Sequence, residues 1–299
     1  MDKINFKGVE ISSLGFGCSL LSRNKSIKAA LTNLETAFDN GITHFDAARL
    51  YGFGEAETIL GKFAKGKRTR ITISSKSGLK GFNFPLGLLP FVNLFRALAK
   101  NVKSKASEAN LNHFNVVEGR FDPETIKDDL NTSLKKIGTD YIDFYLLHEA
   151  NISQANREDI VDTLVKLKDA GKIRSLGLAS NFKSFYSDIS SLNDHYTIIQ
   201  HSDQAYEYNI RSLQFERDQV LRIVYNIFSR YNKIKEYIER DNLELDPLQI
   251  VLSYYKDENK NGVTLFSATN NSNIIRTVKE WNDLSASKNY IDLVKDLKF

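Results

Sequence analysis

The stretch HFDAARLYGFGEAETILG, from His44 to Gly61, reads as a short strand, a loop with two glycines and a helix. It places Asp46 at the end of the strand and Tyr51 in the loop that follows. A carboxylate half-buried at such a position costs several kcal/mol unless a cation pairs with it. The stretch therefore predicts that a cationic side chain from elsewhere in the chain meets Asp46.

The composition of the chain fits either one large α/β domain or two ordinary domains, and it argues against a polyanionic partner. Its 299 residues are 41% hydrophobic, which is enough to bury a sizeable core. The 41 Lys and Arg exceed the 37 Asp and Glu by only four, and no dense basic block is interleaved with aromatics. This pattern argues against nucleic acid as a partner.

The compartment is indicated by the single cysteine and by the N-terminal residues. Cys18 alone excludes an intramolecular disulfide framework, and MDKINFKGVEISS lacks the apolar core of a signal peptide. The most apolar segment, residues 85–100, is interrupted by Pro90, Asn93 and Arg96, so we expect no membrane span. We expect a cytoplasmic protein.

Short β-branched or aromatic runs alternate along the chain with segments of helical periodicity. The eight expected strands are Leu14 to Cys18, Thr43 to Asp46, Ile71 to Ser75, Tyr141 to Leu147, Ile173 to Ala179, Thr197 to His201, Arg222 to Asn226 and Val263 to Ser267. The expected helices include Ile27 to Phe38, Asp159 to Ala170, and one opened by Asp122 as N-cap and Pro123 in the first turn.

Eight alternations without a break in composition predict one domain over residues 1–299, a closed (β/α)8 TIM barrel. A hairpin turning at Lys7 and Gly8 precedes the barrel, and an insert follows the third strand. A doubly wound sheet is the weaker alternative, because no GxGxxG motif follows the first strand.

Four side chains with complementary chemistry fall at one end of this predicted barrel. The carboxyl ends of the strands share one mouth, where Asp46, Tyr51, Lys76 and His148 are expected to converge. Taken singly, each has an ordinary structural explanation, such as a solvated lysine or a buried histidine. Taken together, an acid, a base, a phenol and an imidazole favour a catalytic site.

The chemistry of this set is proton transfer to a carbonyl oxygen. We expect Lys76 to pair with Asp46 and to lower the pKa of Tyr51, because an ammonium favours the phenolate. Tyr51 would then protonate a carbonyl oxygen as a hydride reaches the carbon, and His148 would hydrogen-bond the same oxygen.

The sequence resembles the aldo-keto reductase superfamily over nearly its whole length. The matching stretches are LGFG, GITHFDAARLYGFGEAETILG, ISSKSG, DDLNTSLKKIGTDYIDFYLLHE, AGKIRSLGLASNF and IIQHSDQAYEYN. The resemblance places Asp46, Tyr51, Lys76 and His148 on the catalytic tetrad of the superfamily. It implies an NAD(P)(H)-dependent oxidoreductase that acts on an aldehyde, ketone or sugar.

The resemblance also implies the residues that bind the cofactor. Ser180, Asn181 and Gln200 fall on positions that hold the nicotinamide carboxamide, and Tyr225 on the aromatic that stacks on the ring. Ser180 and Asn181 also suit an N-cap for a helix after Phe182. The remaining cofactor positions are Asn226, Phe228, Ser229, Ser267, Ala268, Asn273, Arg276 and Thr277.

The chain departs from the pattern of the superfamily around the cofactor. YNIFSR replaces a Pro-Leu-Gly type loop after the seventh strand, and residues 209–220 leave little room for the sixth helix. Ser267, Asn273 and Thr277 stand where NADP-binding relatives tend to carry Lys, Arg and Asn, with Arg276 as a partial substitute. NADP(H) is therefore the default of the superfamily, and NAD(H) stays possible.

The substrate is less defined than the reaction. The region FDPETIKDDLNTSLKKIGTD is similar to the branch that oxidises free aldoses such as fucose. The insert at residues 82–105 carries Phe91, Leu94, Phe95 and Leu98 at helical spacing, which predicts a helix on the barrel or beside the pocket. The aromatics that suit stacking on a sugar or another ring are Phe53, Phe82, Phe84 and Tyr206.

Two other function classes stay open. His44, Asp46 and His148 suit a metal-dependent barrel hydrolase, because a strand points His44 and Asp46 to the same side. A nucleotide-binding regulatory subunit with little turnover is the second, and the altered cofactor loop favours it. The sequence does not fix the oligomeric state.

Overall fold

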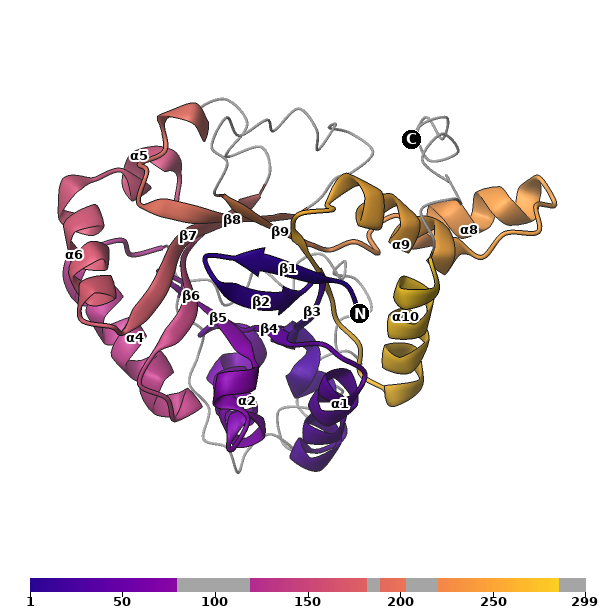
Figure 1. Cartoon of the computed structure of the whole chain (residues 1–299), viewed down its shortest axis with the longest axis horizontal. Coiled ribbons are helices and arrows are strands. Elements are labelled where there is room, and N and C mark those ends of the chain that lie inside the picture. The colour runs from indigo at the N-terminus through magenta and orange to yellow at the C-terminus, as the bar shows by residue number, and fades with distance from the viewer. Residues whose placement is uncertain (80–118, 182–188, 203–219, 285–299) are drawn as a thin grey trace, which may run out of the picture.

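Eight parallel strands close into a barrel at the centre of the molecule (Figure 1). The computed structural model describes residues 1–79, 119–181, 189–202 and 220–284. The strands are β3 (Leu14–Gly17), β4 (His44–Asp46), β5 (Thr72–Ser77), β6 (Ile142–His148), β7 (Ile173–Asn181), β8 (Tyr196–Ser202), β9 (Leu221–Tyr225) and β10 (Val263–Phe266). The predicted (β/α)8 barrel is therefore confirmed, and each strand ends within two residues of its predicted bound.

The last strand closes the barrel against the first. Residues Thr264, Leu265 and Phe266 of β10 lie in parallel register with Leu14, Gly15 and Phe16 of β3. On its other side, β10 pairs with β9. The hydroxyl of Ser267 donates to the carbonyl of Gly17 at 2.8 Å, just beyond the paired residues. The closure thus joins segments 250 residues apart in the sequence.

A two-stranded hairpin covers the amino-terminal end of the barrel, as Figure 1 shows at its centre. Strands β1 (Lys3–Phe6) and β2 (Val9–Ser12) are antiparallel, and Lys7 and Gly8 turn with positive φ angles of 50° and 80°. Two such residues form the turn that matches the twist of the flanking strands. Phe6 and Ile11 pack against barrel residues such as Phe144. The predicted hairpin is confirmed, and its apolar face closes this end.

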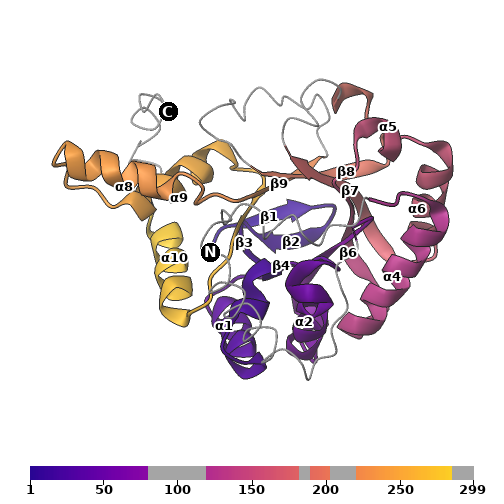
Figure 2. The same ribbon diagram turned by 180° about the vertical axis from the view of Figure 1, so that it is seen from behind.

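Helices cover the outside of the barrel, visible around its rim in Figures 1 and 2. They are α1 (Ile27–Asp39), α2 (Ala56–Ala64), α4 (Pro123–Ile137), α5 (Ile152–Ala155), α6 (Glu158–Asp169), α8 (Tyr231–Arg240), α9 (Pro247–Glu258) and α10 (Asn271–Asp283). Asp122 accepts a hydrogen bond from the Thr125 amide at 2.9 Å and caps α4 as predicted, with Pro123 as the first helical residue. The apolar helix faces and the outer faces of the strands form the main core.

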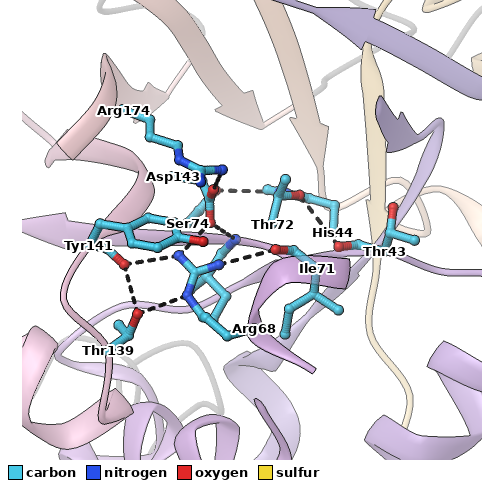
Figure 3. A network of polar contacts seen from close by, with 11 residues as sticks. Thr43, His44, Arg68, Ile71, Thr72, Ser74, Thr139, Tyr141, Asp143 and Arg174 are labelled. Atoms are coloured by element: carbon cyan, nitrogen blue, oxygen red, sulfur yellow. Dashed lines mark hydrogen bonds and ion pairs between the residues drawn. The ribbon is translucent and has the colours of Figure 1, made fainter. Parts of the chain in front are cut away.

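A buried polar network joins the amino-terminal ends of β5, β6 and β7 (Figure 3). Asp143 is 1% exposed and accepts hydrogen bonds from Arg68, Arg174 and the Ile73 amide at 2.7, 2.9 and 2.9 Å. The two guanidinium groups lie over the ring of Tyr141, with their carbons 3.9 and 4.1 Å from its centroid. The network fixes the strand register at the end of the barrel opposite the mouth.

Some predictions concern residues outside the described part of the chain. These are the insert at 82–105 with Phe82, Phe84, Phe91, Leu94, Phe95 and Leu98, the helix after Phe182, Tyr206, and residues 209–219 of the short segment 209–220. Among the helices that the structure describes, none combines the length and apolar character needed to cross a membrane.

Candidate active site

Asp46 and Lys76 form a buried ion pair at the carboxyl end of the barrel. Their side chains are 4% and 1% exposed, and the Lys76 ammonium lies 2.8 Å from both carboxylate oxygens. Lys76 also donates to the carbonyl of Ala47 at 2.9 Å. Strand β5 continues through Lys76 rather than ending before it, so the backbone holds the lysine in place. The cation that Asp46 requires is therefore Lys76.

The hydroxyl of Tyr51 completes this group. It lies 3.4 Å from the Lys76 nitrogen, at the start of the short 3-10 helix η2 (Tyr51–Gly54) that follows β4. Burial and the nearby Asp46 charge raise the pKa of Tyr51 above its usual value. The expected net lowering of this pKa is therefore not found, because burial, and after it the charge of Asp46, outweigh the effect of the Lys76 ammonium.

His148 stands at the end of β6, with its ring edge-on to that of Tyr51 at 6.1 Å between centroids. Burial, assisted by the charge of Lys76, lowers the pKa of His148 to about 3. The imidazole is therefore neutral near pH 7, and it can donate one hydrogen bond and accept another.

A cavity of about 360 Å³ opens directly above these residues. Asp46 and Tyr51 line it together with Tyr225, Asn226 and Phe228, which follow from β9. Ser267, which follows β10, also lines it. The structure thus brings predicted catalytic residues and predicted cofactor residues to one cavity.

A second cavity, of about 490 Å³, shares Phe228, Ser267, Leu20 and Phe266 with the first and extends to α10. Its wall includes the predicted residues Ala268, Asn273, Arg276 and Thr277. Asn270 caps α10 by accepting a hydrogen bond from the Asn273 amide at 2.8 Å. Because Asn273 lines the cavity, the start of this helix lies beside it. The two cavities therefore adjoin, and together they are called the groove.

The family profile of the aldo/keto reductases matches residues 13–224, which is more than half of the chain. The chain belongs to the aldo/keto reductase family. The match includes all four residues of the Asp46, Tyr51, Lys76 and His148 group, and it ends before the loops that follow β9 and β10.

Curated relatives of this aldo/keto reductase share about three residues in ten with it. The probable aldo-keto reductase 1 of Glycine max is 30% identical over 182 residues, which are 59% of this chain and 44% of that protein. The aldo-keto reductase YhdN of Bacillus subtilis is 31% identical over 181 residues, or 58% and 45% of the two chains. The chain thus spans less than half the length of these two relatives.

Solved structures share the fold over almost the whole aldo/keto reductase chain. An aldo-keto reductase of Bacillus halodurans in its holo form aligns with a TM-score of 0.74 and 19% identity, covering 99% of this chain and 96% of that one. An aldo/keto reductase of Klebsiella pneumoniae in complex with NADP and acetate aligns with a TM-score of 0.72 and 16% identity, covering 99% and 95%.

Gln200, predicted to bind the nicotinamide, contacts the catalytic group of this aldo/keto reductase directly. Its amide nitrogen donates to Asp46 at 2.9 Å, and its amide oxygen is buried without a hydrogen-bond partner among the described residues. Ser180 donates to Glu149 at 3.2 Å, and Asn181 ends β7 beside it. A buried acceptor without a donor costs free energy, so the oxygen of Gln200 suits a ligand that carries an N–H group.

The other predicted cofactor residues differ in how much they offer to a ligand. Ser267 already donates to Gly17, Thr277 is buried, and Arg276 pairs with Asp246 at 2.7 Å. The amide of Ser229 donates to the carbonyl of Asn226 at 3.1 Å, and Ser229 lines neither cavity. Asn273 is exposed at the start of α10.

Several residues of the groove were not predicted from the sequence. Gly17, Ser19 and Leu20 line it from the end of β3 and from the following 3-10 helix η1 (Cys18–Arg23). The rule that strand ends form the mouth would have found them, because they follow LGFG directly. Tyr231 and Asn232 at the start of α8, and Leu248 in α9, carried no such signal.

His44 does not join Asp46 and His148 as the metal hypothesis requires. Its ring nitrogens contact the hydroxyls of Thr72 and Ser74 at 2.9 and 3.2 Å, and its ring packs on Phe144. Within the ranges that the structure describes, no three His, Cys, Asp or Glu side chains are placed to hold a metal ion.

Proposed function

We propose that the chain is an oxidoreductase that transfers a hydride between a nicotinamide dinucleotide and a small carbonyl or sugar substrate, with Tyr51 as general acid and base. The observation that carries this proposal is the Lys76 ammonium between the Asp46 carboxylate and the Tyr51 hydroxyl, at the base of a groove. Such a set matches the demands of proton transfer at a carbonyl oxygen.

In the direction of reduction, the resting state of Tyr51 suits its role. Burial keeps the phenol protonated, so Tyr51 is ready to donate its proton to the carbonyl oxygen. Lys76 then stabilises the phenolate that remains, at the 3.4 Å separation of the resting site. Asp46 keeps the ammonium aimed, and neutral His148 donates a hydrogen bond to the same carbonyl oxygen.

The groove fits a nicotinamide dinucleotide, which would supply or accept the hydride when bound. The unpartnered oxygen of Gln200, beside Asp46, suits the carboxamide N–H groups, and Tyr225 offers a ring in the wall of the first cavity. At Gly17, an added Cβ would lie 2.5 Å from the Ser267 hydroxyl, so a side chain at this position would displace Ser267 in the wall of the first cavity. The capped start of α10 suits a phosphate group, because helix N-termini attract anions.

The same residues support weak selectivity between NADP and NAD. Of the positions predicted for a 2′-phosphate, Ser267 and Thr277 are engaged or buried, and Arg276 is shared with Asp246. Asn273 offers an uncharged amide. We expect both nucleotides to bind, with NADP preferred modestly.

A titration of cofactor fluorescence combined with a panel of aldehydes, ketones and aldoses tests the proposal. We expect NADPH to bind and at least one carbonyl compound to be reduced, with the activity lost in Tyr51→Phe. Tight binding of the nucleotide with no turnover on any compound would favour a regulatory nucleotide-binding subunit instead.

A further inference from the structure

A second buried ion pair lies directly behind the Asp46, Lys76 and Tyr51 group. Asp129 on α4 is 0% exposed, and one of its carboxylate oxygens accepts a hydrogen bond from Arg49, which is 9% exposed. The other oxygen accepts from the Ser77 hydroxyl at 3.0 Å and from the Gly78 amide at 3.1 Å. Asp129 thus uses both carboxylate oxygens on groups from two different segments, the loop after β4 and the carboxyl end of β5 with Gly78.

The two segments that Asp129 joins, the loop after β4 and the carboxyl end of β5, are those that carry Tyr51 and Lys76. Arg49 lies two residues before Tyr51, and Ser77 directly follows Lys76. Helix α4 also holds the far end of the Tyr51 segment, because Lys136 donates to the carbonyl of Gly54 at 2.7 Å. Helix α4, outside the barrel wall, therefore contacts both the segment that carries Tyr51 and the end of β5 that carries Lys76.

These contacts hold two reacting groups whose separation affects the rate of proton transfer. The Tyr51 hydroxyl and the Lys76 nitrogen are 3.4 Å apart, at the long limit of a hydrogen bond. Misplacement of a reacting group by about 1 Å can cost a rate factor of about 100. A displacement of either the Tyr51 segment or the end of β5 would therefore alter the rate of proton transfer without any change in the residues that bind the ligand.

We infer that Asp129 is a positioning residue that, through Arg49 and Ser77, sets the distance between the Tyr51 hydroxyl and the Lys76 ammonium. The inference rests on the function proposed above. Asp129 need not contact the substrate or the cofactor, since its two carboxylate oxygens are occupied by these two segments.

The opposite end of the barrel offers a matched control. Asp143 is also buried at a strand, and it pairs with Arg68 and Arg174, but its partners lie at the amino-terminal ends of the strands (Figure 3). Asp129→Asn and Asp143→Asn each remove one buried charge and keep the shape of the side chain. Both variants should lose thermal stability, but only Asp129→Asn should alter the site.

The kinetic test uses NADPH with 4-nitrobenzaldehyde. We expect Asp129→Asn to lower kcat by about 10- to 100-fold, with the KM for NADPH within about twofold. The basic limb of its pH profile should move to higher pH, because a more distant ammonium stabilises the phenolate less. Asp143→Asn should keep kcat and the pH profile of the wild type. If the two variants behave alike in kcat and in pH profile, the inference is wrong.

An NMR measurement separates this inference from the proposed function. In protein labelled at the tyrosine Cζ carbons, the Tyr51 signal is assigned by its loss in Tyr51→Phe. It should shift in Asp129→Asn and stay in place in Asp143→Asn, whether or not the protein turns over a carbonyl compound. A wild type without turnover would contradict the proposed function, and an unmoved Tyr51 signal in Asp129→Asn would contradict the positioning role.

A milder variant covers the case in which Asp129→Asn does not fold. Ser77→Ala removes one of the two hydrogen bonds on the Lys76 side and keeps the Arg49 ion pair. We expect it to lower kcat by about fivefold, with a smaller shift of the Tyr51 signal in the same direction. No change in either quantity would overturn the inference.

Discussion

At the scale of single residues, the proposed chemistry depends first on one phenol. Tyr51→Phe removes the proton donor but keeps the ring, so kcat should fall by about two to four orders of magnitude while the cofactor still binds. Steady-state kinetics and a fluorescence titration of NADPH on the same preparation measure both quantities. Unchanged turnover would rule out Tyr51 as the proton donor.

Lys76 affects both activity and stability. Lys76→Met leaves the Asp46 carboxylate buried with Gln200 as its remaining described partner, so the free energy of unfolding should fall by about 3 to 5 kcal/mol. Turnover should fall as well, because the phenolate of Tyr51 loses its cation. Urea unfolding and kinetics measure the two effects.

The control is Lys67→Met, which removes the more exposed pair with Glu35 and should lower the free energy of unfolding by about 1 kcal/mol or less. A fully active Lys76→Met protein that is as stable as Lys67→Met would refute the role of Lys76.

The residue pairs show what could be predicted from the sequence at this scale. The pairing of Asp46 with Lys76 followed from the rule that strand ends meet at one mouth. The direction of the Tyr51 pKa did not follow, because it depends first on how deeply the folded protein buries the phenol and then on the charge of Asp46. The Arg49 and Asp129 pair was missed, since its members are 80 residues apart and neither stands at a strand end.

At the scale of the elements, the start of α10 sets how strongly the second cavity is expected to bind a phosphate group. An arginine at position 273 would place a cation at the exposed start of this helix, beside the capping Asn270. Asn273→Arg should therefore strengthen NADP binding by about 1.5 to 3 kcal/mol and leave NAD binding nearly unchanged. In the wild type, the two dissociation constants should differ by less than about 100-fold.

Fluorescence titrations of both nucleotides at one fixed salt concentration measure this preference, because salt screens phosphate contacts. Lys279→Arg is a control later in the same helix, where a cation is already present. A wild-type preference for NADP of about a thousandfold or more would mean that other residues hold the phosphate.

The elements themselves were largely predictable. Most strands are short runs of β-branched, aromatic or other apolar residues, as expected for a parallel barrel in which both faces are buried, whereas β5 (TISSKS) is mostly polar. The bounds were less predictable, since β5 extends through Lys76 and Ser77 on account of pairing with β6. That pairing depends on residues about 70 positions away, which local patterns do not contain.

At the scale of the whole molecule, three histidines make stability depend on pH. Burial lowers the pKa of His44 and of His148 to about 3 and that of His201 to about 4, in each case assisted by a nearby cation. The unfolded chain has histidines near pKa 6.5, so it binds more protons than the folded protein between pH 6.5 and about 4. Stability contributed by these histidines is therefore present above pH 6.5 and is lost as the pH falls towards 4 and 3.

Each histidine should contribute a slope of up to about 1.4 kcal/mol per pH unit in this window. Urea unfolding measured from pH 7 to pH 4 gives the slope. His44→Gln should flatten it, whereas His195→Gln, at an exposed position, should not. Equal slopes in the wild type and in His44→Gln would show that His44 is already charged in the folded protein.

The closure of β10 on β3 affects how the chain folds during its synthesis. Until residues 263–266 are available, β3 and β9 each lack a neighbour on one side. Unpaired strand edges invite pairing with other chains. Phe6 and Ile11 also lack Val263 and Leu265, the last barrel residues of their cluster. A nascent chain that has emerged only as far as β9 is therefore an open sheet prone to aggregation, and protection at that point of synthesis would govern the yield of folded protein.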